Sequence, residues 1–237
     1  MAKTAIVTGA SGNGIGRSAA LTLARDGFDI IVNYRSKSEN AEAVCEEIIK
    51  SGRNAVPVKA DLFSHEECDR LINEAVFAFG RIDACVIGPG AGWNPEPVEK
   101  LNAEKSLNDV IQEVHPLYAL VPRLIGEMKK AGGGRIISIA SNPDLPSPSY
   151  SYNTAKNART AAMLGLSGPC WKHRITVNVI APGPVEHLGS FEDAVRQVSR
   201  FPADDRNISP QDIAETVSFL CSDKGRFITG NVLRYQF

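Results

Sequence analysis

Short apolar runs alternate with longer amphipathic stretches along the whole sequence, and this alternation constrains the fold more than any other feature. An apolar run of about four to eight residues between turn residues is typical of a buried strand, whereas a longer stretch with helical spacing is typical of a helix. Strands that alternate with helices favour right-handed crossovers and a parallel sheet. We expect strands at 4–8, 28–33, 54–59, 82–87, 135–140, 175–180 and 231–235, and helices at 15–26, 39–50, 65–79, 104–130, 151–166 and 211–221.

No linker divides this pattern into two cores, so we expect one domain over residues 1–237. Its fold class should be α/β: a doubly wound, Rossmann-type, seven-stranded parallel sheet with helices on both faces. Pro57 cannot donate a backbone hydrogen bond, so its strand should lie at a sheet edge. Ligands of such sheets bind beyond the carboxyl ends of the strands, where the strand order reverses. Functional residues should therefore directly follow strands.

Charge and cysteine content exclude several classes of protein. The chain carries 26 Lys plus Arg and 27 Asp plus Glu, which leaves no basic excess for a nucleic-acid or membrane partner. No run approaches the roughly 18 apolar residues of a membrane helix. Met1-Ala2-Lys3 leads directly into a strand pattern, so we expect no signal peptide and a cytoplasmic protein. The five cysteines form no C-x-x-C pair, so we expect neither a disulfide framework nor a metal site.

A glycine-rich loop, TGASGNGIG at 8–16, separates the first expected strand from the first expected helix. Glycines there permit positive φ angles and let the backbone approach a pyrophosphate, while the helix N-terminus offers free N–H groups to phosphates. A plain flexible turn is the alternative, and the general G-x-G-x-x-G spacing is absent. The position between strand and helix favours a dinucleotide site.

Two later segments concern the ribose and adenine of such a cofactor. Arg35 follows the second expected strand, where an acidic residue would bind the ribose hydroxyls of NAD and an arginine the 2′-phosphate of NADP. A solvated surface arginine is the alternative. Asp61 and Leu62 follow the third strand, where Asp61 could instead cap the next helix. The sequence therefore favours NADP(H) over NAD(H).

Tyr152 and Lys156 open a helix after the fifth strand, and their i, i+4 spacing places both on one helical face. A neighbouring ammonium group favours the phenolate and should lower the pKa of the tyrosine, which would make it a usable proton donor near neutral pH. Ser141 directly follows the same strand. Ser138 is a competitor, but it lies inside the strand. A packed tyrosine and a turn serine are the alternatives.

These motifs together resemble the short-chain dehydrogenase/reductase family. Its T-G-x-x-x-G-x-G signature fits the loop at 8–16 with one extra residue, and its P-G-x-V motif fits 182–185. The resemblance covers nearly the whole chain. It implies that Ser141 binds the substrate carbonyl, that Tyr152 transfers the proton, and that Lys156 holds the nicotinamide ribose and tunes Tyr152. The cofactor-binding residues expected in this way are Gly9, Ser11, Asn13, Gly14, Ile15, Gly16, Arg35, Asp61, Leu62, Gly88, Gly90, Tyr152, Lys156, Pro182, Gly183 and Val185.

The sequence departs from this family at two places that concern the site. The N-N-A-G motif after the fourth strand is replaced by Ile87-Gly88-Pro89-Gly90, which has neither asparagine. The family's fourth catalytic residue is an asparagine in the long helix, and we expect His115 at that position as a proton relay, with a merely packed histidine as the alternative. Residues 184–209 form a variable segment that we expect to be the substrate lid.

The resemblance is greatest to bacterial 3-oxoacyl-acyl-carrier-protein reductases. It implies an enzyme that transfers a hydride between NADP(H) and a small-molecule or acyl-thioester carbonyl, and that forms a homodimer or homotetramer. A non-catalytic NADP(H) sensor is the alternative, motivated by the missing asparagines. A lyase like the halohydrin dehalogenases is disfavoured, because Lys156 and the glycine loop are retained.

Overall fold

The computed structural model describes residues 2–144, 148–199 and 207–235. Within these residues seven parallel strands form one sheet in the order β3-β2-β1-β4-β5-β6-β7. This confirms the expected doubly wound α/β fold. The strands are β1 (Lys3–Val7), β2 (Phe28–Tyr34), β3 (Ala55–Lys59), β4 (Ala84–Ile87), β5 (Gly134–Ile139), β6 (Ile175–Ala181) and β7 (Val232–Arg234).

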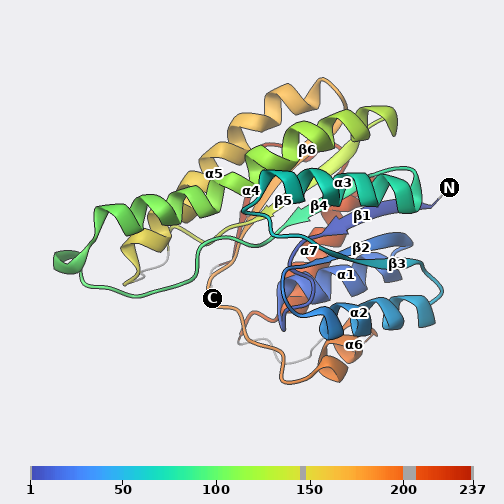
Figure 1. Cartoon of the computed structure of the whole chain (residues 1–237), viewed down its shortest axis with the longest axis horizontal. Helices are drawn as coiled ribbons and strands as arrows, with labels where there is room; N and C mark the ends of the chain where they lie inside the picture. Colours follow the sequence, from blue (N-terminus) through green and yellow to red (C-terminus); the bar gives the residue numbers. More distant parts are fainter. Residues whose placement is uncertain (1, 145–147, 200–206, 236–237) are drawn as a thin grey trace.

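Helices cover both faces of the sheet, as Figure 1 shows. Successive side chains of a strand point to opposite faces of the sheet. Because helices cover both faces, the strands are apolar almost throughout. Val7 packs into the core under one group of helices, while its neighbour Ile6 packs into the other core. One group is α1 (Ile15–Arg25), α2 (Ser38–Lys50), α6 (Phe191–Ser199) and α7 (Pro210–Cys221), and the other is α3 (His65–Phe79), α4 (Ala103–Lys130) and α5 (Tyr150–Trp171).

The strand order reverses between β1 and β4, and this junction is fixed by Thr8. The Thr8 hydroxyl donates to the Val86 carbonyl at 2.9 Å and accepts from the Gly88 amide at 2.9 Å. The loops that follow these two strands therefore leave the sheet side by side and form the crevice in which such folds bind ligands. The strand that contains Pro57 lies at the sheet edge, as its missing donor requires.

Three helices differ from the sequence prediction. Pro116 and Pro122 lie inside the pattern at 104–130, where each would interrupt a helix on local grounds, but α4 runs continuously through both. Packing of α4 against α3 and α5 outweighs the missing backbone hydrogen bonds. Helix α5 extends to Trp171, past Leu166. Helix α6 lies within the lid segment and is not among the helices expected above.

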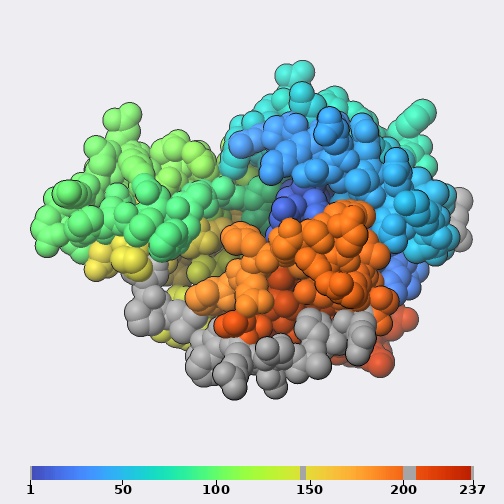
Figure 2. Space-filling view, turned by 90° about the horizontal axis from the view of Figure 1, so that it is seen from below, coloured from blue at the N-terminus to red at the C-terminus, as the bar shows by residue number. Residues whose placement is uncertain are grey.

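The lid segment expected at 184–209 lies partly outside the described residues, at 200–206. In its described part, α6 packs against α1, and Val185 forms a β-bridge with Ile208. Figure 2 shows the first, dark blue part of the chain recessed between α2 and this orange segment. Two shorter 3₁₀ helices, Val98–Lys100 and Asp223–Gly225, complete the described elements.

The described residues contain no group of side chains suited to hold a metal ion. Their helices are all too short or too polar to span a bilayer. All five cysteines carry buried free thiols: Cys45, Cys68, Cys85, Cys170 and Cys221. Burial raises the pKa of the Cys45 thiol to about 12, so that thiol is un-ionised near neutral pH.

Candidate active site

The glycine loop is held by Asn33, a buried residue near the end of β2. Its side-chain oxygen accepts from the Gly9 amide at 3.3 Å, and its side-chain nitrogen donates to the Ala60 carbonyl at 3.1 Å. Gly9 has a φ of +65°, a conformation that favours glycine. A Cβ at Gly16 would lie 2.7 Å from the Gly9 carbonyl oxygen, so only glycine lets α1 begin this close to the loop.

The start of α1 suits a phosphate. Gly14 occupies the N-cap position, where no side chain caps the helix, and a Cβ there would meet no protein atom within 4 Å. The space beside this N-cap is open, and it lies at the positive end of the helix dipole, where the first amides of a helix have no intrahelical partner. A glycine-rich cradle at a helix N-terminus is suited to a pyrophosphate, so the loop fits a dinucleotide cofactor.

A cleft of about 280 Å³ opens beyond the carboxyl ends of β1, β2 and β3. Arg35 and Lys37 line it together with a single acid, Asp61, and the Arg35 guanidinium lies 6.0 Å from the centre of the Phe63 ring. The Asp61 carboxylate accepts from the Phe63 amide, while Ser64 and not Asp61 caps α3. Because two cations and one carboxylate line the cleft, it favours the binding of an anionic group. Of the residues predicted for the cofactor, the cleft brings together Gly9, Ser11, Arg35, Asp61, Leu62 and Gly90.

A second pocket, of about 550 Å³, lies beyond β5 and β6. It brings Ser141, Tyr152 and Lys156 together, as the motifs predict. The pocket is also lined by the predicted Ile15, Pro182, Gly183 and Val185, and by the unpredicted Trp93, Ile139, Ala140, Asn142, Pro148, Pro184 and His187. The other predicted cofactor-binding residues line neither pocket: Asn13, Gly14 and Gly16 lie in the glycine loop, and the Gly88 amide donates to Thr8.

The electrostatics of Tyr152 differ from the sequence expectation. Burial, and then the Glu113 carboxylate, raise the pKa of the Tyr152 hydroxyl to about 12, while Arg159 and a hydrogen bond with Ser141 act in the opposite direction. The expectation that Lys156 lowers this pKa is therefore not met. The phenol is un-ionised at neutral pH and can only donate its proton there.

Lys156 contacts a buried carboxylate that the sequence analysis missed. Its Nζ lies 2.9 Å from Oε1 of Glu113, and the other carboxylate oxygen lies 2.5 Å from Nε of Arg159. Glu113 and Arg159 are fully buried. Burial, followed by the Arg159 charge, lowers the pKa of Lys156 to about 8, and Glu113 limits this fall. We call these three residues the buried charge cluster.

Arg159 also holds the loop in which the family's two asparagines are missing. Its guanidinium donates to the Ile87 carbonyl at 3.1 Å and the Ile139 carbonyl at 3.3 Å, and it donates to Pro89 as well. Ser138, the competitor of Ser141, is buried and accepts from the same guanidinium at 3.3 Å. A side chain from α5 therefore anchors this loop, which lacks both asparagines, to the sheet.

Gly90 is the glycine that remains from the family's N-N-A-G motif, and the buried charge cluster leaves no room for a side chain at this position. A Cβ at Gly90 would collide with the Glu113 carboxylate, and the neighbouring Ala91 amide donates to Glu113 Oε1 at 2.8 Å. The loop after β4 and the carboxylate are therefore fitted to each other. The sequence did contain a signal for this cluster. A charged residue lies on the apolar stripe of α4, and an opposite charge lies on the apolar stripe of α5.

His115 lies away from Lys156. Residues two apart on a helix differ by about 200° in direction, so His115 and Glu113 face opposite sides of α4. The His115 ring nitrogen Nδ1 lies 2.9 Å from the Leu62 carbonyl oxygen. Glu113 occupies the place beside Lys156 that we expected of His115, and a relay by His115 stays a prediction that this contact does not support.

The fold and the paired clefts define an α/β oxidoreductase that binds a nicotinamide cofactor. A family model described as enoyl-(acyl carrier protein) reductase matches residues 9–235. A 3-oxoacyl-[acyl-carrier-protein] reductase of Staphylococcus aureus is 32% identical over 98% of this chain and 96% of its own. An uncharacterized oxidoreductase of Methylorubrum extorquens is 34% identical over 98% and 95%. The chain therefore belongs to the short-chain dehydrogenase/reductase family.

Solved structures agree with this assignment. An acetoin dehydrogenase from Salmonella typhimurium superimposes with a TM-score of 0.84 at 27% identity, over 99% of this chain and 95% of that one. A short-chain dehydrogenase from Burkholderia cenocepacia in complex with NADP gives 0.84 at 27% identity, over 99% and 96%. The relatives share the fold, but the Staphylococcus reductase and the Salmonella dehydrogenase are named for different substrates.

Proposed function

We propose that this protein is an NADP(H)-dependent ketoreductase that interconverts a carbonyl and a secondary alcohol, with a 3-oxoacyl thioester as the substrate class. The observation that carries the proposal is the convergence of Ser141, Tyr152 and Lys156 in one pocket next to a cation-lined cleft. The 3-oxoacyl-[acyl-carrier-protein] reductase among the relatives supports the substrate class. Arg35 and Lys37 in the cleft support NADP(H), because a 2′-phosphate needs cations.

In the reducing direction, the Ser141 hydroxyl donates a hydrogen bond to the substrate carbonyl oxygen and the Tyr152 hydroxyl donates the proton. A reduced nicotinamide, when bound, would supply the hydride to the carbonyl carbon. A pKa of about 12 keeps Tyr152 protonated and ready to donate. The Lys156 ammonium has three N–H donors, and its pairing with Glu113 leaves donors for the nicotinamide ribose. The buried free thiols support a reducing compartment such as the cytoplasm.

Turnover tests the proposal directly. The absorbance of NADPH should fall when the protein is given a 3-oxoacyl thioester. Tyr152→Phe should reduce this rate at least about 100-fold, because general acid catalysis contributes that much, and should leave NADPH binding intact. Arg35→Ala should weaken NADPH binding but not NADH binding. Unchanged turnover in Tyr152→Phe would exclude the assigned acid.

A second candidate is an NADP(H)-binding sensor without turnover. The contact between Lys156 and Glu113 favours it, because a lysine engaged by a carboxylate supports the tyrosine less. One experiment distinguishes the reductase from the sensor. Tight NADPH binding without consumption across a panel of ketones and 3-oxoacyl thioesters would select the sensor, and consumption would select the reductase.

A further inference from the structure

A pocket of about 460 Å³ lies at the edge of the sheet opposite to the candidate active site. Its lining comes from the amino ends of the strands. Lys3 and Phe28 begin β1 and β2, Arg135 is the second residue of β5, and Arg174 directly precedes β6. The candidate active site lies beyond the carboxyl ends of the same strands, so the two pockets are separated by the length of the sheet.

This opposite-edge pocket is strongly basic in a protein whose formal net charge is −1. A single acid, Asp83, lies among the described residues that line it. It is engaged by Arg81 at 2.5 Å, so it does not neutralise the others. The basic residues of the lining are Lys3, Arg81, Arg135, Arg174 and Arg226. Lys3 pairs with Asp223 at 3.3 Å, so Arg135, Arg174 and Arg226 are the lining cations that no ion pair compensates among the described residues. Their mutual repulsion is unfavourable unless an anion offsets it.

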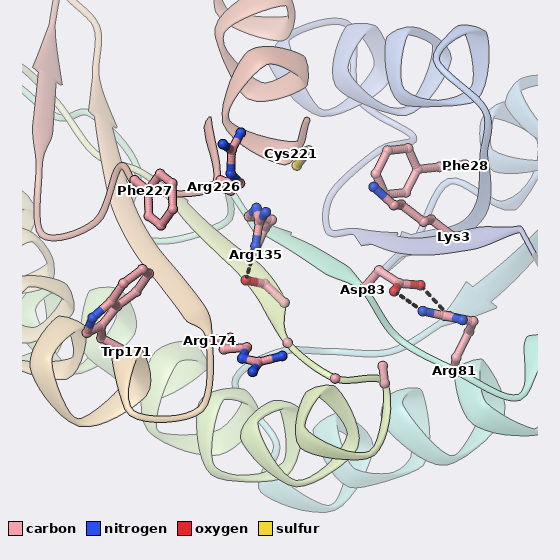
Figure 3. Close-up of a pocket in the computed structure, with 14 residues that line it drawn as sticks. Lys3, Phe28, Arg81, Asp83, Arg135, Trp171, Arg174, Cys221, Arg226 and Phe227 are labelled. Carbon is pink, nitrogen blue, oxygen red and sulfur yellow. Dashed lines mark hydrogen bonds and ion pairs between the residues drawn. The ribbon is translucent and has the colours of Figure 1, made fainter. Parts of the chain in front are cut away.

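Arg135 and Arg174 lack an acidic partner among the described residues. The Arg135 guanidinium donates to the Gly134 carbonyl at 3.1 Å, and its buried Nε has no hydrogen-bond partner there. No ion pair involves Arg174 in the same part of the chain. Figure 3 shows Arg135 and Arg174 in the middle of the pocket, between Trp171 and Phe227 on one side and the Arg81–Asp83 pair on the other. Arg174 itself is exposed, so its guanidinium is accessible to a ligand. A buried N–H group without a partner, here Nε of Arg135, points to a missing acceptor.

The backbone conformation of Arg174 is a second, independent indication that its side chain has a function. It has a φ of +60°, which is the only left-handed conformation of a non-glycine residue in the described chain. Glycine would adopt it without strain, whereas an arginine is held there at a cost. Its carbonyl accepts from the Gly134 amide at 3.2 Å, so the neighbouring turn fixes this backbone. A strained position that keeps a charged side chain is typical of a functional site.

The aromatic side of the pocket indicates the rest of the ligand. The rings of Trp171 and Phe227 meet edge to face with their centroids 6.2 Å apart, and both side chains are exposed. An exposed aromatic pair beside cations suits a ligand with an apolar or planar part next to its anionic group. We propose that the opposite-edge pocket binds a small organic phosphate, whose phosphate is held by Arg135 and Arg174 and whose planar part lies against Trp171 and Phe227.

Tryptophan fluorescence tests this proposal, because the chain has two tryptophans, Trp93 and Trp171. In a Trp93→Phe background, Trp171 alone reports on the pocket. Phenyl phosphate should change its fluorescence saturably, and phenol should not. Arg174→Gly and Arg135→Gln should each weaken phenyl phosphate at least about tenfold, because each removes a charge-assisted hydrogen bond. Arg70→Gln, an equal change of charge on exposed α3, should leave binding unchanged.

Arg174→Gly separates a binding role from a structural one. A binding role predicts weaker ligand binding with an unfolding midpoint that is equal or higher, since glycine relieves the backbone strain. A lower midpoint in this variant would assign Arg174 to stability and overturn the proposal. It would also be overturned if phenyl phosphate failed to bind, if inorganic phosphate bound equally tightly, or if the Trp171 signal depended on protein concentration alone, which would indicate a contact between copies.

Discussion

At the scale of single residues, the chemistry of the site depends on a carboxylate that faces Lys156 and Arg159 at the same time. Glu113 accepts from the Ala91 amide and lies 2.9 Å from the lysine amine, with no exposure to solvent. A buried carboxylate is tolerated only where cations and donors offset the loss of water. Glu113 is therefore a positioning residue. It holds Lys156 and links it to the loop after β4.

Removal of one charge from this cluster should be costly. Glu113→Gln leaves the Arg159 guanidinium buried without its counter-charge, so the free energy of unfolding should fall by about 3–5 kcal/mol. The double variant Glu113→Gln, Arg159→Met removes the Glu113–Arg159 ion pair and leaves Lys156 in the cluster. It should be more stable than Glu113→Gln alone, because the buried guanidinium without a counter-charge is gone. Urea unfolding of the three proteins measures this. If both variants lost the same free energy of unfolding, the uncompensated charge of Arg159 would not be the cause of the loss in Glu113→Gln.

The pH dependence of alcohol oxidation follows from the raised pKa of Tyr152. Oxidation needs the phenolate, and a pKa of about 12 means that its fraction still grows with pH above neutrality. The oxidation rate should therefore keep rising well past neutral pH. Because the Glu113 charge raises this pKa, Glu113→Gln should lower it and shift the rise to lower pH. Rate profiles of both proteins check the shift, and a shift to higher pH would contradict the assigned electrostatics.

At the scale of elements, the loop and α1 form one phosphate-binding unit. Gly16 allows the helix to approach the Gly9 carbonyl, whereas Gly14 faces open space. Gly16→Ala should lower the free energy of unfolding by about 1–3 kcal/mol, because overpacking at this contact forces the backbone apart. It should also weaken cofactor binding.

Gly14→Ala is the matched control. Its φ of −161° is extended backbone that alanine adopts, so stability should change by less than about 0.5 kcal/mol. The added methyl group enters the space where a phosphate would lie, so cofactor binding should still weaken. Thermal unfolding and NADPH titration separate the two effects. Equal stability losses in both variants would refute the difference between the two glycines.

The elements themselves were largely predictable, and the buried charge cluster was not. Strand positions follow from apolar runs, and the edge position of β3 follows from Pro57 alone. The continuity of α4 through Pro116 depends on tertiary packing, which local pattern does not contain. The contact of Glu113 with Lys156 requires the relative rotation of α4 and α5. The resemblance to the family, which selected His115, could not supply that rotation, because side chains two residues apart on a helix point in nearly opposite directions.

At the scale of the whole molecule, the sheet separates two pockets of different character. The carboxyl edge holds Tyr152 and Lys156 in the pocket shared with the proposed cofactor. The amino edge holds the basic pocket with Arg135 and Arg174. The rigid parallel sheet between them gives each set of residues a fixed frame, since strand ends move little relative to one another. The remaining surface feature that needs an explanation is an apolar face on the outside of α4.

This apolar face predicts self-association. Leu107, Ile111 and Tyr118 lie within about 40° of one another around α4 and are each more than half exposed. Exposed apolar side chains that line up on one helix face are typical of an interface. We expect a dimer or tetramer by light scattering, and Tyr118→Glu should shift it to a smaller species, because a carboxylate cannot be buried there unpaired. Phe77→Glu, an equal change at an isolated exposed ring on α3, should leave the mass unchanged. A monomeric parent protein would show that this face is not an interface between copies.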